Sequence, residues 1–178
     1  MTPYYEHGGI TIYHGDCLSV MGHMAPHYGE RPFDLLLTDP PYGLGEGQKK
    51  AASRYRSNPS WVAARDTKSY PYGQWDGSTN PEAIALARSL CRSQIIFGGN
   101  YYDLPPASCW LVWDKEREGD TFSGAELAFV NKGVRLDVFR HRWHGMVKAS
   151  EQGQKRVHPT QKPIALAEWC FDHYGKPL

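Results

Sequence analysis

The sequence has no long apolar run and no paired cysteines, and each absence argues against a class of protein. Uninterrupted apolar stretches, such as 35–37 and 164–167, are far too short to cross a bilayer. The first residues carry no basic stretch followed by an apolar one, so no secretory signal is expected. The four cysteines form no C-x-x-C pair, which argues against a zinc cluster or a disulfide scaffold. We therefore expect a cytoplasmic protein with reduced thiols and no membrane contact.

The charge is nearly balanced overall but unevenly distributed along the chain. Net charge is +1 over 178 residues, a length that suits a single domain spanning 1–178. Positions 131–162 nevertheless carry eight Lys or Arg against two acidic residues, and positions 45–68 carry six against two. Two solvated loops would explain these runs, and so would two segments that neutralise phosphates. The second reading makes 43–79 and 131–157 loop regions for DNA contact, with a set of six phosphate ligands: Arg135, Arg140, Arg142, Lys148, Lys155 and Arg156.

Hydrophobic patterns predict alternating strands and helices. The run 33–38 is typical of a buried strand that ends at two prolines. Asn80 as N-cap and Pro81 at the first helical position predict a helix through Arg92. Pro163 opens a last helix, which Gly175 ends. Further strands are predicted over 9–13, 94–97, 109–113, 125–131 and 136–143, and a short helix over 17–24. This alternation predicts an α/β fold with a mostly parallel, doubly wound sheet.

The segment Asp39-Pro40-Pro41-Tyr42 follows the predicted strand 33–38 directly. Open α/β sheets bind their ligands at the carboxyl ends of strands. The prolines remove two backbone donors and favour an extended backbone, so the Asp39 carboxylate and the Pro40 carbonyl can face one small space. Two acceptors beside an aromatic ring suit a planar group that bears an amino group. The alternative is a turn that ends the strand, with Tyr42 there for packing.

These residues resemble the catalytic motif of S-adenosylmethionine-dependent DNA amino-methyltransferases. Other segments resemble the same family in the order of its circularly permuted β group. They are Gly15-Asp16-Cys17-Leu18, Phe97-Gly98-Gly99-Asn100-Tyr101, Trp113-Asp114-Lys115, Ala125-Glu126-Leu127-Ala128-Phe129 and His158-Pro159-Thr160-Gln161-Lys162-Pro163. The resemblance covers about residues 9–175 and implies a Rossmann-like methyltransferase fold that acts on double-stranded DNA.

The resemblance also implies roles for individual residues. Asp39 and the Pro40 carbonyl hold the amino group of a flipped base, and Tyr42 stacks on that base. Asp39 favours adenine N6 over cytosine N4, which is the alternative target. The cofactor S-adenosylmethionine is contacted by Asp16, Cys17, His158, Thr160 and Lys162. No metal site is expected from His141 and His144, and the resemblance gives Asp114 and Glu126 no acid/base role.

One part of the family pattern is missing from this sequence. The family continues after the last helix into a strand and a glycine-rich loop that binds the cofactor, whereas this chain ends at Leu178. We therefore expect a fold that is incomplete at its C-terminal end, with an unpaired sheet edge beside 33–38, weak cofactor binding and self-association. A truncated chain, a degenerate gene or a completing partner chain would each explain the pattern. The rival hypothesis is an inactive remnant that at most binds DNA.

Overall fold

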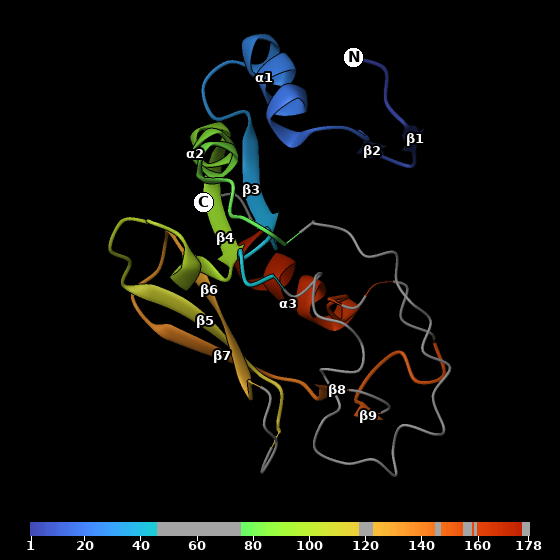
Figure 1. The fold of residues 1–178 in the computed structure, drawn as a ribbon, viewed down its shortest axis with the longest axis vertical. Helices are drawn as coiled ribbons and strands as arrows, with labels where there is room; N and C mark the ends of the chain where they lie inside the picture. The colour runs from blue at the N-terminus through green and yellow to red at the C-terminus, as the bar shows by residue number, and fades with distance from the viewer. Residues whose placement is uncertain (46–75, 118–122, 145–146, 155–157, 159, 176–178) are drawn as a thin grey trace.

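The computed structural model describes residues 1–45, 76–117, 123–144, 147–154, 158 and 160–175. Within these residues the protein is a mixed α/β fold with three α-helices and a five-stranded sheet (Figure 1). Two small antiparallel sheets of two strands each lie outside the main sheet.

Four of the five strands in the main sheet point the same way. The strand order is β3-β4-β6-β5-β7, with β3 parallel to β4, β5 parallel to β7, and β6 antiparallel to both of its neighbours. The sheet is therefore mixed, because β5 and β6 form a hairpin inside it. The bounds are Phe33–Thr38 (β3), Cys91–Phe97 (β4), Cys109–Asp114 (β5), Ala125–Val130 (β6) and Leu136–Arg140 (β7).

The three helices begin at the expected signals and end close to the expected positions. Asp16 caps α1 (Cys17–Tyr28) by accepting from the Ser19 amide, and α1 runs four residues beyond the predicted end at Met24. Asn80 caps α2 (Pro81–Leu90), which stops two residues short of Arg92 because β4 has already begun. Pro163 precedes α3 (Ile164–Tyr174), and Gly175 follows it.

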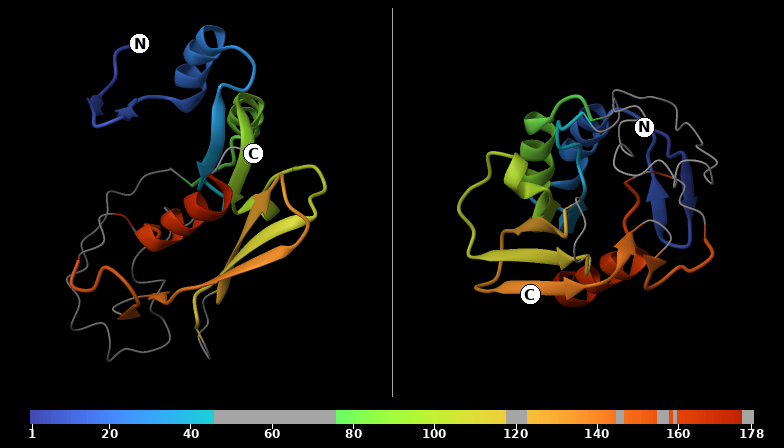
Figure 2. Two further views of the ribbon diagram at one scale, coloured as in Figure 1. Left: turned by 180° about the vertical axis from the view of Figure 1, so that it is seen from behind. Right: turned by 60° about the horizontal axis from the view of Figure 1, so that its bottom comes forward.

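Helices pack on both faces of the sheet, and the alternation of side chains along β4 shows why. Ile95 and Phe97 belong to the core on the face covered by α3, which contributes Leu166 and Cys170. Ile96 points to the opposite face, into a smaller cluster with an α2 residue. Figure 2 shows α3 and α2 on these two sides of the strands. The expectation of helices on both faces is thus met.

An exposed hairpin precedes α1. Strand β1 (Tyr5–His7) pairs antiparallel with β2 (Ile10–Ile12), and all six residues are exposed. Gly8 and Gly9, with φ of 58° and 79°, form the two-residue turn. The predicted strand over 9–13 therefore exists, but among the described strands its only partner is β1 rather than the main sheet.

The segment 131–157 is not a loop throughout. It contains β7, then β8 (Trp143–His144) and β9 (Val147–Lys148), which pair with each other. Most of the other predicted loop, 46–75 within 43–79, lies outside the described residues.

Strand β3 forms one edge of the sheet. Among the described strands its only neighbour is β4, and Leu35, Leu36 and Leu37 are half-buried rather than enclosed. Within the described residues, no helix is both long enough and apolar enough to span a bilayer.

Candidate active site

The strand directions bring several functional side chains to one end of the sheet, where β3, β4, β5 and β7 finish. We call this the carboxyl end of the sheet, and the opposite end its amino end. Asp39 follows the last residue of β3, and Gly98 follows β4. Lys115 follows β5 at the same end of the sheet, because β5 points the same way as β4. Glu126 lies near the start of the antiparallel strand β6, opposite Trp113. Carboxyl ends of parallel strands are where open α/β sheets place ligand sites.

The turn from Asp39 to Tyr42 is held by side chains from other segments. The Tyr42 hydroxyl donates to Asp39 Oδ1 at 2.5 Å. Tyr102 donates to the Pro41 carbonyl at 2.5 Å, and buried Asp76 accepts from the Gly43 amide at 2.9 Å. This turn is therefore fixed at both ends, and Asp39 is presented at the surface of the sheet edge.

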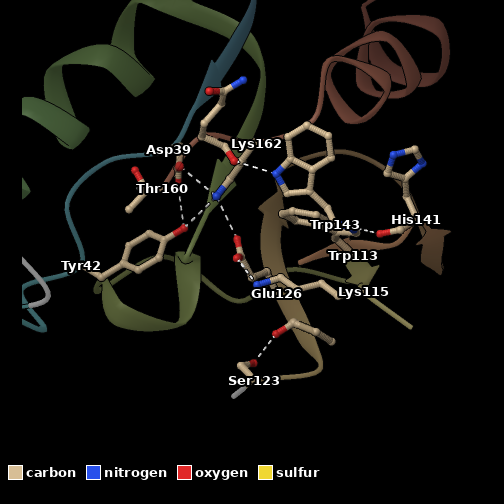
Figure 3. A network of polar contacts seen from close by, with 12 residues as sticks. Asp39, Tyr42, Trp113, Lys115, Ser123, Glu126, His141, Trp143, Thr160 and Lys162 are labelled. Carbon is tan, nitrogen blue, oxygen red and sulfur yellow. Dashed lines mark hydrogen bonds and ion pairs between the residues drawn. The ribbon is translucent and has the colours of Figure 1, made fainter. Parts of the chain in front are cut away.

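Lys162 reaches the same carboxylate from the residue before the Pro163 cap of α3. Its Nζ lies 2.8 Å from Asp39 Oδ2 and 2.8 Å from Glu126 Oε2 (Figure 3). The Trp143 ring N–H donates to the Gln161 carbonyl at 2.9 Å, which fixes the backbone just before Lys162. The side chain of Lys162 is only 18% exposed, so this ammonium lies in a largely enclosed position.

Glu126 is paired with two lysines. Its Oε1 lies 2.5 Å from Lys115 Nζ, while Oε2 bonds Lys162. Burial raises the pKa of the Glu126 carboxyl, but the ammonium groups of Lys162 and Lys115 outweigh it and leave the pKa below its ordinary value. Glu126 is thus ionised at neutral pH. We call these residues, with their two carboxylates, two ammonium groups and one hydroxyl, the charge network: Asp39, Tyr42, Lys115, Glu126 and Lys162.

The ring of Tyr42 is packed between backbone and another aromatic side chain. A Cβ at Gly98 would collide with it, so the ring depends on a glycine there. Tyr101 stacks on the ring with centroids 5.1 Å apart and planes 18° apart. Burial and the Asp39 carboxylate raise the pKa of the Tyr42 hydroxyl far above its ordinary value. Tyr42 therefore stays protonated and donates to Asp39.

A small cavity opens beside Asp39 and Lys162. Its volume is about 130 Å³, and its other walls come from the end of β3, from β4 and from the start of α3. Apart from Thr38 these walls are apolar: Leu37, Phe97, Pro163, Leu166 and Ala167. Pockets for whole cofactors usually measure roughly 300–1,000 Å³, so this one suits part of such a molecule.

The structure does not bring Asp16 and Cys17 into the charge network. Asp16 accepts from the backbone amide and hydroxyl of Ser19, which lowers the pKa of its carboxyl. Cys17 is the exposed first residue of α1, and α1 lies beyond the amino end of β3 (Figure 1). Asp16 thus has a structural role as a helix cap, whatever else it contacts.

His158 and Thr160 lie in the turn that leads to Lys162. His158 Nδ1 and Thr160 Oγ1 are 2.8 Å apart, and both residues are exposed. The Gln161 amide donates to the His158 carbonyl at 3.2 Å. Of the three cofactor residues predicted in this segment, Lys162 is the one whose ion pair with Asp39 is described above.

The predicted DNA-contacting residues do not all lie at the same end of the sheet. Arg140 ends β7 at the carboxyl end of the sheet, where Asp39 also lies. Its Nε is 3.6 Å from Asp114 Oδ2. Arg135 precedes β7 at the amino end of the sheet and pairs with Asp137 at 2.9 Å. Arg142 is exposed, and Lys148 donates to the Gln154 carbonyl. Lys155 and Arg156 lie outside the described residues.

Sequence reasoning missed how much the site depends on Lys115, Glu126 and Tyr101. The hairpin register that sets Trp113 opposite Glu126 places Lys115 within reach of that carboxylate. Glu126 is the one charged residue in the apolar strand 125–130, which was a usable signal, but the strand order was not visible. Among described side chains, no group of three His, Cys, Asp or Glu is arranged to hold a metal ion.

Comparison with known proteins adds no relative. A scan against models of protein families finds no match, and a search of curated proteins finds no significant one. The function is therefore inferred from the residues and their arrangement.

Proposed function

We propose that this protein is a DNA methyltransferase that transfers a methyl group from S-adenosylmethionine to an exocyclic amino group of a flipped base. Adenine N6 is the target we favour. The observation that carries the proposal is the environment of Asp39. This carboxylate lies at the carboxyl end of β3 and already accepts a hydrogen bond from a nitrogen donor, Lys162 Nζ, at 2.8 Å. A base amino group needs an acceptor of this kind.

The residues of the chain activate the amino group by position and electrostatics. Its nitrogen is a poor nucleophile because the lone pair is delocalised into the base. A hydrogen bond donated by its N–H group to Asp39 favours a tetrahedral nitrogen whose lone pair points away from the ring. Tyr42 holds Asp39 Oδ1 through its protonated hydroxyl and so fixes the carboxylate. When bound, the cofactor would supply an electrophilic methyl group and leave as its neutral thioether, and the methylated nitrogen would then lose a proton, for which the Asp39 carboxylate is an acceptor. Preorganised acceptors of this kind lower the barrier without a covalent intermediate.

The residues beside the cavity fit one end of the cofactor. Lys162 offers an ammonium group for a carboxylate, and Leu37, Phe97 and Leu166 offer apolar walls for a methylene chain. The cavity is too small for the adenosine as well. Asp16 and Cys17, with His158 and Thr160, remain our proposed contacts for the rest of the cofactor.

The fold supports the same proposal. Helices on both faces of the sheet and four strands pointing one way agree with a Rossmann-like methyltransferase fold. The four free thiols agree with a reducing compartment, the cytoplasm. Double-stranded DNA is the proposed partner.

The experiment is Asp39→Ala, with Asp172→Ala as the matched control on the exposed face of α3. Purified protein is assayed for transfer of labelled methyl groups to DNA, with the modified base identified by mass spectrometry. Asp39→Ala should cost about 3 kcal/mol or more of transition-state stabilisation, while DNA binding persists. Near wild-type turnover in Asp39→Ala would overturn the role of Asp39. Wild-type protein without transfer would overturn the function, and methylcytosine as the product would replace the adenine target.

A further inference from the structure

The ammonium group of Lys162 is bonded to Asp39, the residue proposed above as the acceptor of the substrate amino group. It donates to Asp39 Oδ2, while Tyr42 donates to Oδ1, so both oxygens of the carboxylate are engaged. Each carboxylate oxygen can accept a second hydrogen bond, but a substrate amino group that takes the position of either donor needs that donor to give way. Tyr42 is held in place by Gly98 and Tyr101, so Lys162 is the donor that can leave.

Lys162 has a second carboxylate within reach. Glu126 Oε2 lies 2.8 Å from its Nζ, the same distance as Asp39 Oδ2. Glu126 is itself fixed by Lys115 at 2.5 Å, and Lys115 lies over the Trp113 ring at 5.0 Å. Leaving a largely enclosed ammonium without a partner would be costly. Because Glu126 is present, Lys162 can release Asp39 and still remain paired. An ammonium group has three donors, so the donor released from Asp39 is available to the cofactor carboxylate proposed above.

We propose that Lys162 is a positioning residue whose ammonium group stands in for the substrate amino group on Asp39, and that Glu126 retains it when the substrate arrives. This inference rests on the proposed function. It gives Glu126 and Lys115 a role that the sequence did not assign: they are the fixed end of an exchange between two carboxylates.

The surroundings of Lys162 suit such an exchange. Its Nζ lies 5.0 Å from the centroid of the Phe97 ring, so an aromatic face stabilises the cation on either carboxylate. The exchange moves no net charge into the site, because a neutral amino group replaces an ammonium group that stays on Glu126.

The first test is Lys162→Arg, which keeps the positive charge. A guanidinium group pairs with carboxylates through two parallel hydrogen bonds and holds Asp39 more firmly than an ammonium group does. We expect kcat/KM for DNA methylation, measured at saturating S-adenosylmethionine, to fall about tenfold or more, with an unchanged melting temperature. If Lys162 only supplied a structural charge, arginine would rescue activity, and that result would overturn the inference.

The second test is Glu126→Gln, with Glu168→Gln on the exposed face of α3 as the control. Without the second carboxylate, Lys162 stays on Asp39 and competes with the substrate. We expect KM for target DNA to rise about tenfold while kcat changes less. The control should match the wild type.

A third measurement does not depend on activity. Acetylation of the Lys162 amine by acetic anhydride, followed by mass spectrometry, should be about tenfold faster in Glu126→Gln than in the wild type, because the ammonium group then has one charged partner instead of two. Unchanged labelling, or an active wild type with an unchanged KM in Glu126→Gln, would overturn this inference and leave the proposed function standing. A wild type that labels as expected but transfers no methyl group would overturn the proposed function instead.

Discussion

Gly98 occupies a position where any side chain would meet the ring of Tyr42. Its φ of 67° lies in the left-handed region, and a Cβ there would collide with the ring. Gly98→Ala should therefore combine backbone strain with overpacking, and overpacking alone typically costs about 1–3 kcal/mol. Gly153→Ala is the control, because Gly153 has φ of 77° and open space around it.

Urea unfolding of the two variants separates strain from collision. Gly98→Ala should lose at least about 1 kcal/mol more unfolding free energy than Gly153→Ala. Equal losses in the two variants would show that the Tyr42 ring does not depend on Gly98.

The charge network also predicts how stability responds to acid. The folded-state pKa of Glu126 lies below its ordinary value of 4.5, because Lys162 and Lys115 outweigh burial. Glu126 therefore contributes stability that is present above pH 4.5 and lost as the pH falls through the folded pKa. The difference in unfolding free energy between the wild type and Glu126→Gln should be constant from about pH 5 to 7 and shrink below pH 4.5. A difference that does not change with pH would contradict this assignment.

At the residue scale, the sequence predicted which groups matter better than how they are paired. Asp39 and Tyr42 could be identified because two prolines separate them just after an apolar run. Their direct hydrogen bond could not, since it depends on Gly98 and on Tyr101, which follow a different strand. The family resemblance assigns Lys162 to the cofactor, whereas the structure pairs it with Asp39 and Glu126.

The orientation of β7 separates two arginines that belong to one basic run in the sequence. Arg140 lies at the carboxyl end of the sheet, with Asp39, and Arg135 lies at the amino end. There the Arg135 side chain is 76% exposed and paired with Asp137. Removing one cationic side chain that neutralises a phosphate lowers the log–log salt slope of DNA binding by about 0.9. Arg140→Ala with Arg142→Ala should therefore reduce the slope by about 1.8. Arg135→Ala, the control for an equally exposed arginine, should change it little.

Fluorescence anisotropy with a labelled duplex, at several salt concentrations, measures these slopes. A larger effect from Arg135→Ala than from the Arg140 and Arg142 pair would mean that DNA lies at the amino end of the sheet.

At the element scale, the sequence predicted the kinds of element but not their neighbours. Each predicted strand and helix has a counterpart, because apolar periodicity and caps are local signals. The helix predicted to Arg92 ends at Leu90 because Cys91 already pairs with Phe33, a contact between distant parts of the chain. The position of β6 between β4 and β5 is equally non-local. The hairpin over 5–12 was missed, although Gly8-Gly9 is a turn signal.

For the molecule as a whole, the two edges of the sheet differ in composition. β7 carries charged residues and a Tyr174–Asp137 hydrogen bond. β3 carries three successive leucines, which are only half-buried although they pack against the two cores. Among the described strands β3 has one neighbour, so the backbone of 34–38 has no strand partner on its other side within the described residues. Charged side chains protect edge strands from pairing with other molecules, and β3 has only Asp34, which is bound to Arg92.

We therefore expect the chain to self-associate through β3. Light scattering should show an apparent mass that rises with protein concentration, because a second molecule satisfies the backbone groups of the edge and covers the leucines. Hydrogen exchange measured at low and high concentration identifies the edge. Amides of 34–38 should become more protected at high concentration, while those of 136–140 should not. A mass that stays monomeric at every concentration would contradict the prediction, and protection confined to 136–140 would place the contact on β7, where Leu136 is 64% exposed.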